Sequence, residues 1–225
     1  MQPIFDEEVE TWNSLYGGVQ GGRYAVFQEC ARRRVRRRRA LCVEMLAPAP
    51  GMAVLDLGCG SGMFRAPVER EGAHWTGLDL SFGMLAHGRR ETGKDGSRAR
   101  FVNGSGLALP FAEGTFDGIL CVGVVNFHRP ESVPRLLRET ARVLRRGGTL
   151  VFTSIRLDVL TWARSRLYPG VPQPFSSPGP LYMLHYRKVL RLLEELPLAC
   201  TDMMHISKYL GLPHYTLFKM TKGGS

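Results

Sequence analysis

The clearest structural signal in the chain is the stretch Val54-Leu55-Asp56-Leu57-Gly58-Cys59-Gly60-Ser61-Gly62. A short apolar run leads directly into a Gly-x-Gly-x-Gly turn, which must open a helix. Glycines are needed there because a ligand approaches the backbone more closely than a Cβ would permit. The stretch therefore predicts a strand, a glycine turn and a helix that together hold a ligand against the main chain.

Two carboxylates next to this turn narrow the kind of ligand. Asp56 precedes the first glycine by two residues, where its charge would be unfavourable for a pyrophosphate. A dinucleotide fingerprint has its third glycine at position 63, which is Met63 here, and this argues against a nicotinamide oxidoreductase. Asp79 follows Gly58 by 21 residues, and its carboxylate can accept hydrogen bonds from both hydroxyls of a ribose. The pattern describes a nucleoside with a cationic or amine-bearing tail and no phosphate, and S-adenosylmethionine fits that description.

The rest of the chain shows short apolar runs in alternation with amphipathic stretches. This rhythm predicts an α/β fold, a parallel sheet covered by helices on both faces. We expect strands at 53–57, 74–80, 99–104, 118–125, 149–155, 203–207 and 215–221, and helices at 6–16, 24–46, 132–144 and 186–196.

Composition sets the general class of the protein. Of 225 residues, 44% are hydrophobic and 22% are charged, which is ordinary for a globular chain with one core. The acidic start MQPIFDEEVE is unlike a secretory signal, so we expect a cytoplasmic protein. The five cysteines form no CxxC pair, so no metal site is expected. We expect a helical cap over residues 1–50, followed by one domain over 51–225 with no second domain.

Four motifs in order resemble the class I S-adenosylmethionine-dependent methyltransferases of the small-molecule type. They are VLDLGCGSG (54–62), TGLDLSFGML (76–85), LPFAEGTFDGILC (109–121) and RVLRRGGTL (142–150). The resemblance implies a Rossmann-like, seven-stranded, mostly parallel sheet with an antiparallel last strand. It also implies transfer of a methyl group from S-adenosylmethionine to a small organic acceptor, which we expect to be at oxygen.

The resemblance also implies roles for individual residues. The methionine part of the cofactor would lie along the glycine turn near Asp56, and Asp79 would hold the ribose. The family often has an acid where Ser105 stands, and a neutral acceptor there would hold the adenine more weakly. The expected cofactor-binding residues are Asp56, Gly58, Cys59, Gly60, Asp79, Leu80, Met84, Ser105, Gly106, Cys121 and Val122.

The acceptor side carries weaker signals. His128 follows the fourth expected strand, at the edge where α/β folds bind ligands, and is the candidate catalytic residue. Tyr16 and Tyr24 are candidates for contact with the substrate. The stretch 156–184 contains five prolines and several aromatic residues, and we expect it to cover the acceptor. Each of these residues could equally be an ordinary surface or core residue.

The segment Arg32–Arg39 carries seven arginines and no acid, and therefore most of the net charge of +10. It could be a solvated helix face, a binding site for an anionic acceptor, or a surface that binds RNA or an anionic membrane. The segment lacks the interleaved aromatic residues that stack on bases, which disfavours RNA. An RNA or protein methyltransferase that uses this segment, and a noncatalytic S-adenosylmethionine-binding subunit, remain the alternatives.

Overall fold

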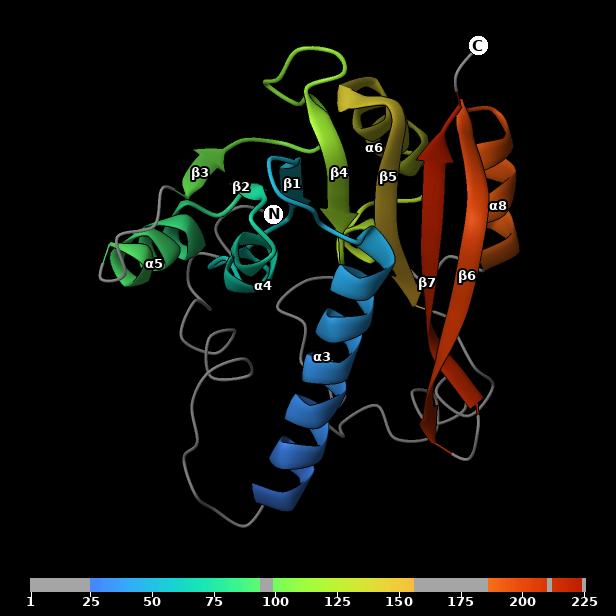
Figure 1. Cartoon of the computed structure of the whole chain (residues 1–225). Helices are drawn as coiled ribbons and strands as arrows, with labels where there is room; N and C mark the ends of the chain where they lie inside the picture. The colour runs from blue at the N-terminus through green and yellow to red at the C-terminus, as the bar shows by residue number, and fades with distance from the viewer. Residues whose placement is uncertain (1–24, 94–98, 156–185, 210–211, 224–225) are drawn as a thin grey trace.

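The computed structural model describes residues 25–93, 99–155, 186–209 and 212–223 (Figure 1). Strands and helices alternate through the first two thirds of the chain, as the apolar pattern predicts. The elements are α3 (Ala25–Leu46), β1 (Ala53–Leu57), α4 (Arg65–Arg70), β2 (His74–Asp79), α5 (Phe82–Thr92), β3 (Arg100–Asn103), β4 (Phe116–Cys121), the 3-10 turn η1 (Val125–Phe127), α6 (Val133–Val143), β5 (Leu144–Ile155), α8 (Tyr186–Glu194), β6 (Leu198–Tyr209) and β7 (Leu212–Lys222).

The seven strands form one sheet in the order β3-β2-β1-β4-β5-β7-β6. The first five strands in this order are parallel, and β7 is antiparallel to both of its neighbours, β5 and β6. The expected mostly parallel sheet with an antiparallel last strand is confirmed. Since parallel strands all end at the same edge, β1, β2 and β4 bring the segments that follow them together at the carboxyl edge.

Side chains of alternate residues in each strand enter two separate cores, one on each face of the sheet. Leu55 and Leu57 of β1 pack in the core that includes residues of α6 and α8. Val54 packs on the other face, with Cys42 and Leu46 of α3 and with residues of α4 and α5. The last turns of α3 are therefore part of the core of the sheet.

Several strand boundaries differ from the sequence-based expectations. The apolar run 118–125 does not continue as a strand, because β4 ends at Cys121 and Gly123 adopts a φ of 78°. Val125 then packs in the core from η1, so the apolar character of the run reflects burial in a turn. The last three strands, β5, β6 and β7, are all longer than expected, and β5 begins at Leu144 directly after α6. The expected helix 6–16 and the stretch 156–184 lie outside the described residues.

The helix α3 is long enough to extend beyond the sheet. Its C-terminal half packs on β4, β5 and β7, while its N-terminal half continues past the carboxyl ends of β4 and β5 (Figure 1). Among the described residues, no helix combines the length and the apolar character that crossing a membrane requires.

Candidate functional site

The glycine turn lies at the carboxyl edge between β1 and α4. Gly58, Gly60 and Gly62 have φ values of 72°, 53° and 89°, a region that residues with a Cβ rarely occupy. The amides of Gly58 and Cys59 donate to the carbonyl of Leu78, at 2.7 and 3.1 Å, and so fix the turn to the end of β2. The main chain is therefore held in the conformation that the glycine pattern predicts.

The carboxylate of Asp79 is bound on both oxygens by main-chain amides at the end of β2. Its Oδ2 accepts from the amide of Gly60 at 2.8 Å, and its Oδ1 accepts from the amide of Ser81 at 2.9 Å. The Asn103 side chain donates to the carbonyls of Asp79 and Leu80 and holds the same segment from β3. The two amides therefore fix the orientation of the Asp79 carboxylate beside the glycine turn.

The carboxyl group of Asp56 is almost fully buried, on the face of the sheet that α3 and α4 cover. Trp75 Nε1 donates to its Oδ2 at 3.3 Å. Burial raises the pKa of Asp56 to about 8, against the opposing effect of the Trp75 hydrogen bond, and the charge of Asp79 raises it further. Asp56 is thus a buried acid whose charge would be stabilised by a nearby cation.

The expected adenine-side residues differ in exposure. Met84 is 7% exposed, and the space beside Gly60 that a Cβ would occupy lies 2.9 Å from its Cε. Leu80 is 39% exposed at the end of β2, where a flat ring could cover it. Ser81 caps α5, because its hydroxyl accepts from the amide of Met84 at 3.1 Å. Leu80 is open to a ligand, whereas Met84 is packed beside the glycine turn.

Ser105 and Gly106 lie in a tight turn after β3. The Ser105 hydroxyl accepts from the amide of Leu107 at 3.2 Å, which uses part of its acceptor capacity. A Cβ on Gly106 would lie 2.7 Å from the side chain of Leu136 in α6, so this glycine permits close packing with the core. The hydroxyl of Ser105 is the side-chain polar group that this turn offers to a base.

The end of β4 contributes main chain and one histidine. The Cys121 thiol is buried in the core, and burial raises its pKa to about 12, so it would border a ligand through its backbone. Val122 is half-buried beside it. His128 Nδ1 lies 3.1 Å from the carbonyl oxygen of Val124, and burial lowers the pKa of the imidazole, although this hydrogen bond opposes the effect. A carbonyl only accepts, so Nδ1 carries the proton and the lone pair of Nε2 is available.

Three residues of the site have no motif signal in the sequence. Trp75 pairs with Asp56, Asn103 fixes the end of β2, and the Val124 side chain occupies the space that a Cβ on Gly58 would need. Each acts through the packing of elements that are distant in sequence, so the local pattern could not reveal it. Tyr16 and Tyr24 lie outside the described residues.

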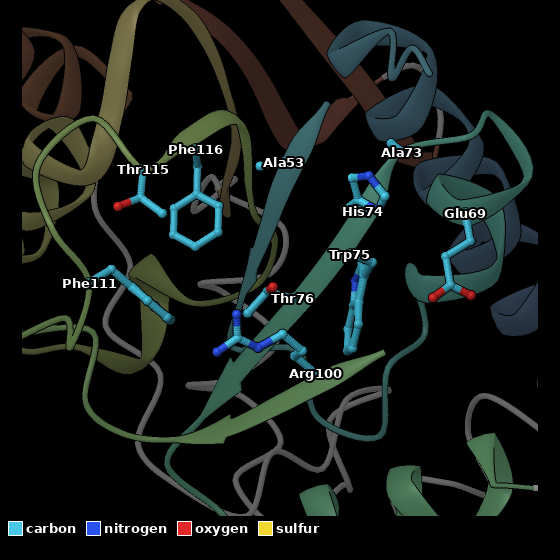
Figure 2. Close-up of a pocket in the computed structure, with 10 residues that line it drawn as sticks. All are labelled: Ala53, Glu69, Ala73, His74, Trp75, Thr76, Arg100, Phe111, Thr115 and Phe116. Atoms are coloured by element: carbon cyan, nitrogen blue, oxygen red, sulfur yellow. The ribbon is translucent and has the colours of Figure 1, made fainter. Parts of the chain in front are cut away.

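A separate hollow of about 460 Å³ lies at the opposite edge of the sheet (Figure 2). Ala53, His74, Arg100 and Phe116 line it, and each is the first residue of its strand, β1, β2, β3 and β4 respectively. This hollow therefore lies at the amino edge and does not belong to the glycine-turn site. Within the described segments, no group of three His, Cys, Asp or Glu residues is placed to hold a metal ion.

Comparison with known proteins shows what the segment around the glycine turn is similar to. Residues 54–148, which span the glycine turn, Asp79 and the end of β4, match a family model described as a methyltransferase domain. This part of the chain is similar to methyltransferase domains. Over 132 residues it is 36% identical to the ubiquinone/menaquinone biosynthesis C-methyltransferase UbiE of Paracoccus denitrificans, covering 55% of this chain and 52% of that protein.

Two further similarities extend this result to another relative and to the whole fold. Over 114 residues the chain is 38% identical to a malonyl-(acyl-carrier protein) O-methyltransferase of Erwinia pyrifoliae, covering 50% of this chain and 41% of that protein. The chain spans about half the length of the curated relatives it matches. The crystal structure of magnesium protoporphyrin IX methyltransferase from Synechocystis PCC 6803 with bound SAH has the same fold, with a TM-score of 0.80 and 18% identity, covering 99% of this chain and 98% of that one.

Proposed function

We propose that the methyltransferase domain binds S-adenosylmethionine along the glycine turn and transfers its methyl group to a hydroxyl oxygen of a small organic acceptor. The observation that carries this proposal is the carboxylate of Asp79, held by the amides of Gly60 and Ser81 beside the glycine turn. This arrangement fits a ribose whose nucleoside tail follows the main chain of residues 58–60. The relative that bound SAH in its crystal structure supports the same class of cofactor.

The charges of the site fit a ligand with a cationic tail. Asp56 and Asp79 lie close enough for the charge of Asp79 to raise the pKa of Asp56, and burial raises it further. A positive group between the two carboxylates would relieve their mutual repulsion, whereas a pyrophosphate would increase it. When bound, S-adenosylmethionine supplies a methyl group already activated on a sulfonium.

The proton of the acceptor hydroxyl would go to His128. The imidazole is neutral at neutral pH because burial lowers its pKa, and the hydrogen bond from Nδ1 to Val124 fixes the ring. The Nε2 lone pair would then accept the hydroxyl proton of the acceptor. A base in this position is worth roughly 10²–10⁴-fold in rate.

Calorimetric titration of the intact chain tests the cofactor assignment. We expect S-adenosylmethionine to bind, and Asp79→Asn to weaken binding by about 10–100-fold, because hydrogen bonds to a charged acceptor are worth about 1.5–3 kcal/mol. Asp202→Asn on the exposed part of β6 is the matched control and should bind as the wild type does. Tight binding of NADH with no heat from S-adenosylmethionine would contradict the assignment.

A carbon acceptor is the second candidate, because one of the relatives is named as a C-methyltransferase. Incubation with S-adenosylmethionine carrying a ¹³C-labelled methyl group, followed by NMR of the product, separates the two outcomes, since an O-methyl and a C-methyl carbon differ widely in chemical shift. Binding of the cofactor without release of S-adenosylhomocysteine from any acceptor would favour a noncatalytic subunit.

A further inference from the structure

Arginines from two helices form a continuous cationic surface on the side of the molecule that α3 and α4 cover. Arg33, Arg36 and Arg37 are exposed along α3, and Arg70 is exposed at the end of α4. Arg39 is half-buried between them, and burial together with the charges of Arg70 and Arg36 lowers its pKa. We call these five residues the arginine face.

Four residues of the arginine face, Arg36, Arg37, Arg39 and Arg70, differ from other arginines of the protein in their lack of acidic partners among the described residues. Elsewhere, Arg65 pairs with Glu69, Arg142 with Glu139 and Arg145 with Asp117, at 2.9, 2.9 and 2.6 Å. Within the described parts of the chain, Arg36, Arg37, Arg39 and Arg70 form no ion pair. Burial of the charged Arg39 side chain among like charges is electrostatically unfavourable in the isolated protein. A bound anion would offset this repulsion.

One arginine of the run has a structural role and lies apart from this face. Arg38 is 9% exposed, and its guanidinium lies 4.7 Å from the centre of the Tyr215 ring of β7. This contact attaches α3 to the sheet and directs its neighbours Arg36, Arg37 and Arg39 to the outer side of the helix. The arginine face is therefore fixed in orientation by the fold.

The residues between the arginines indicate which anion the surface fits. The exposed ridge of α3 continues with Ala40, and the segment 33–46 contains no aromatic residue. Single-stranded RNA is bound through aromatic residues that stack on bases, and protein interfaces depend on buried aromatic and apolar anchors. Adsorption to a layer of phosphate headgroups requires only clustered basic residues, and each arginine is worth about five-fold in affinity.

We propose that the arginine face docks the protein on the surface of a bilayer that contains anionic phospholipids. The guanidinium groups would form paired hydrogen bonds to lipid phosphates, in the geometry for which arginine is suited. Such docking would place the side of the molecule that α3 and α4 cover against the membrane. Docking requires no cofactor and is independent of the proposed reaction.

Vesicle flotation with the full chain tests this proposal. We expect the protein to float with vesicles of about 30% phosphatidylglycerol in phosphatidylcholine, to remain behind with pure phosphatidylcholine, and to dissociate as salt shortens the Debye length. The variant R36Q/R37Q/R70Q should lose about 100-fold in affinity, from three arginines at about five-fold each. All three residues are exposed, so the fold should be retained, which circular dichroism checks.

A variant with the same loss of charge on the other face is the matched control. R138Q/K188Q/R191Q removes three exposed basic residues from α6 and α8, and should float as the wild type does. Equal loss of affinity in both variants would show that only net charge matters and would overturn the proposal. Wild-type affinity in R36Q/R37Q/R70Q would overturn it, as would tighter binding to a single-stranded RNA 20-mer or to polyglutamate than to the anionic vesicles.

Discussion

The role proposed for His128 rests on its surroundings. The hydrogen bond to Val124 fixes the ring, and burial lowers the pKa of the imidazole. We expect His128→Ala to lower turnover by about 10²–10⁴-fold, as for the loss of a general base. Affinity for S-adenosylmethionine, measured by calorimetry, should remain within about two-fold of the wild type, and equal turnover in both proteins would rule out this role.

The pH dependence of the reaction gives a second test of His128. In the proposed role His128 acts as the neutral imidazole, and burial lowers its pKa from the ordinary value of 6.5. The rate should therefore be independent of pH around neutrality and fall only as the pH drops through a pKa below 6.5. A single-turnover pH profile measures this, and a profile that falls already between pH 8 and 7 would contradict it.

The buried carboxyl group of Asp56 should make the free energy of unfolding depend on pH. Because its folded pKa of about 8 is above the unfolded value of 3.8, the folded state binds the proton more tightly, and the contribution of Asp56 to stability decreases as the pH rises between these values. Asp56→Asn cannot ionise and still accepts from Trp75. In urea unfolding of the ligand-free protein, the stability of this variant relative to the wild type should rise by about 1–4 kcal/mol from pH 5 to pH 8. Glu71→Gln, an exposed residue after α4, should show no such change.

Between β1 and α4, the glycine turn can be tested as a structural element. A Cβ on Gly58 would overlap the side chain of Val124, and φ is 72°. Gly51 has a similar φ of 81° with no atom within 4 Å of the added Cβ. Gly58→Ala should therefore abolish cofactor binding in calorimetry, whereas Gly51→Ala should cost only about 1–2 kcal/mol of backbone strain and leave binding unchanged. Retained binding in Gly58→Ala would show that Val124 can move aside.

Elements with strong local patterns were predictable from the sequence. The helix with the arginine run, the strand before the glycine turn and the acid at the end of β2 all have periodicity or spacing that requires no knowledge of distant residues. The end of β4 was not predictable in this way, because Val124 and Val125 are as apolar as strand residues. Their burial depends on Gly58 and on η1, contacts that form only when β1 and β4 lie side by side.

The candidate site likewise contains some residues that sequence spacing predicts and others that only the structure reveals. Gly58 and Gly60 follow β1, and Asp79 ends β2, the next strand along the chain and a neighbour of β1 in the sheet, so their spacing in the sequence predicts that they lie together. Trp75 faces Asp56 only because β1 and β2 pair in the register Val54 with Trp75 and Asp56 with Gly77, and Gly77 leaves room for the indole. A sequence pattern does not specify register between strands, so this pair becomes visible only in the structure.

On the scale of the whole molecule, α3 connects the two functions proposed above. Its C-terminal half packs on β4, β5 and β7, and Arg38 of the same helix contacts Tyr215 of β7. The arginine face therefore belongs to the body that carries the glycine turn. A shift of α3 at a charged surface would be transmitted to the strands that position the site, so vesicles could change the rate as well as the location of the reaction.

The position of β7 has a consequence for how the protein is made. Of the seven strands it is the last in the chain, yet it lies between β5 and β6. During synthesis on the ribosome, both neighbours are available before the strand that joins them. Until it emerges, each presents an open backbone edge to other nascent chains, so a product halted before Leu212 would be prone to aggregate and a natural target for chaperones.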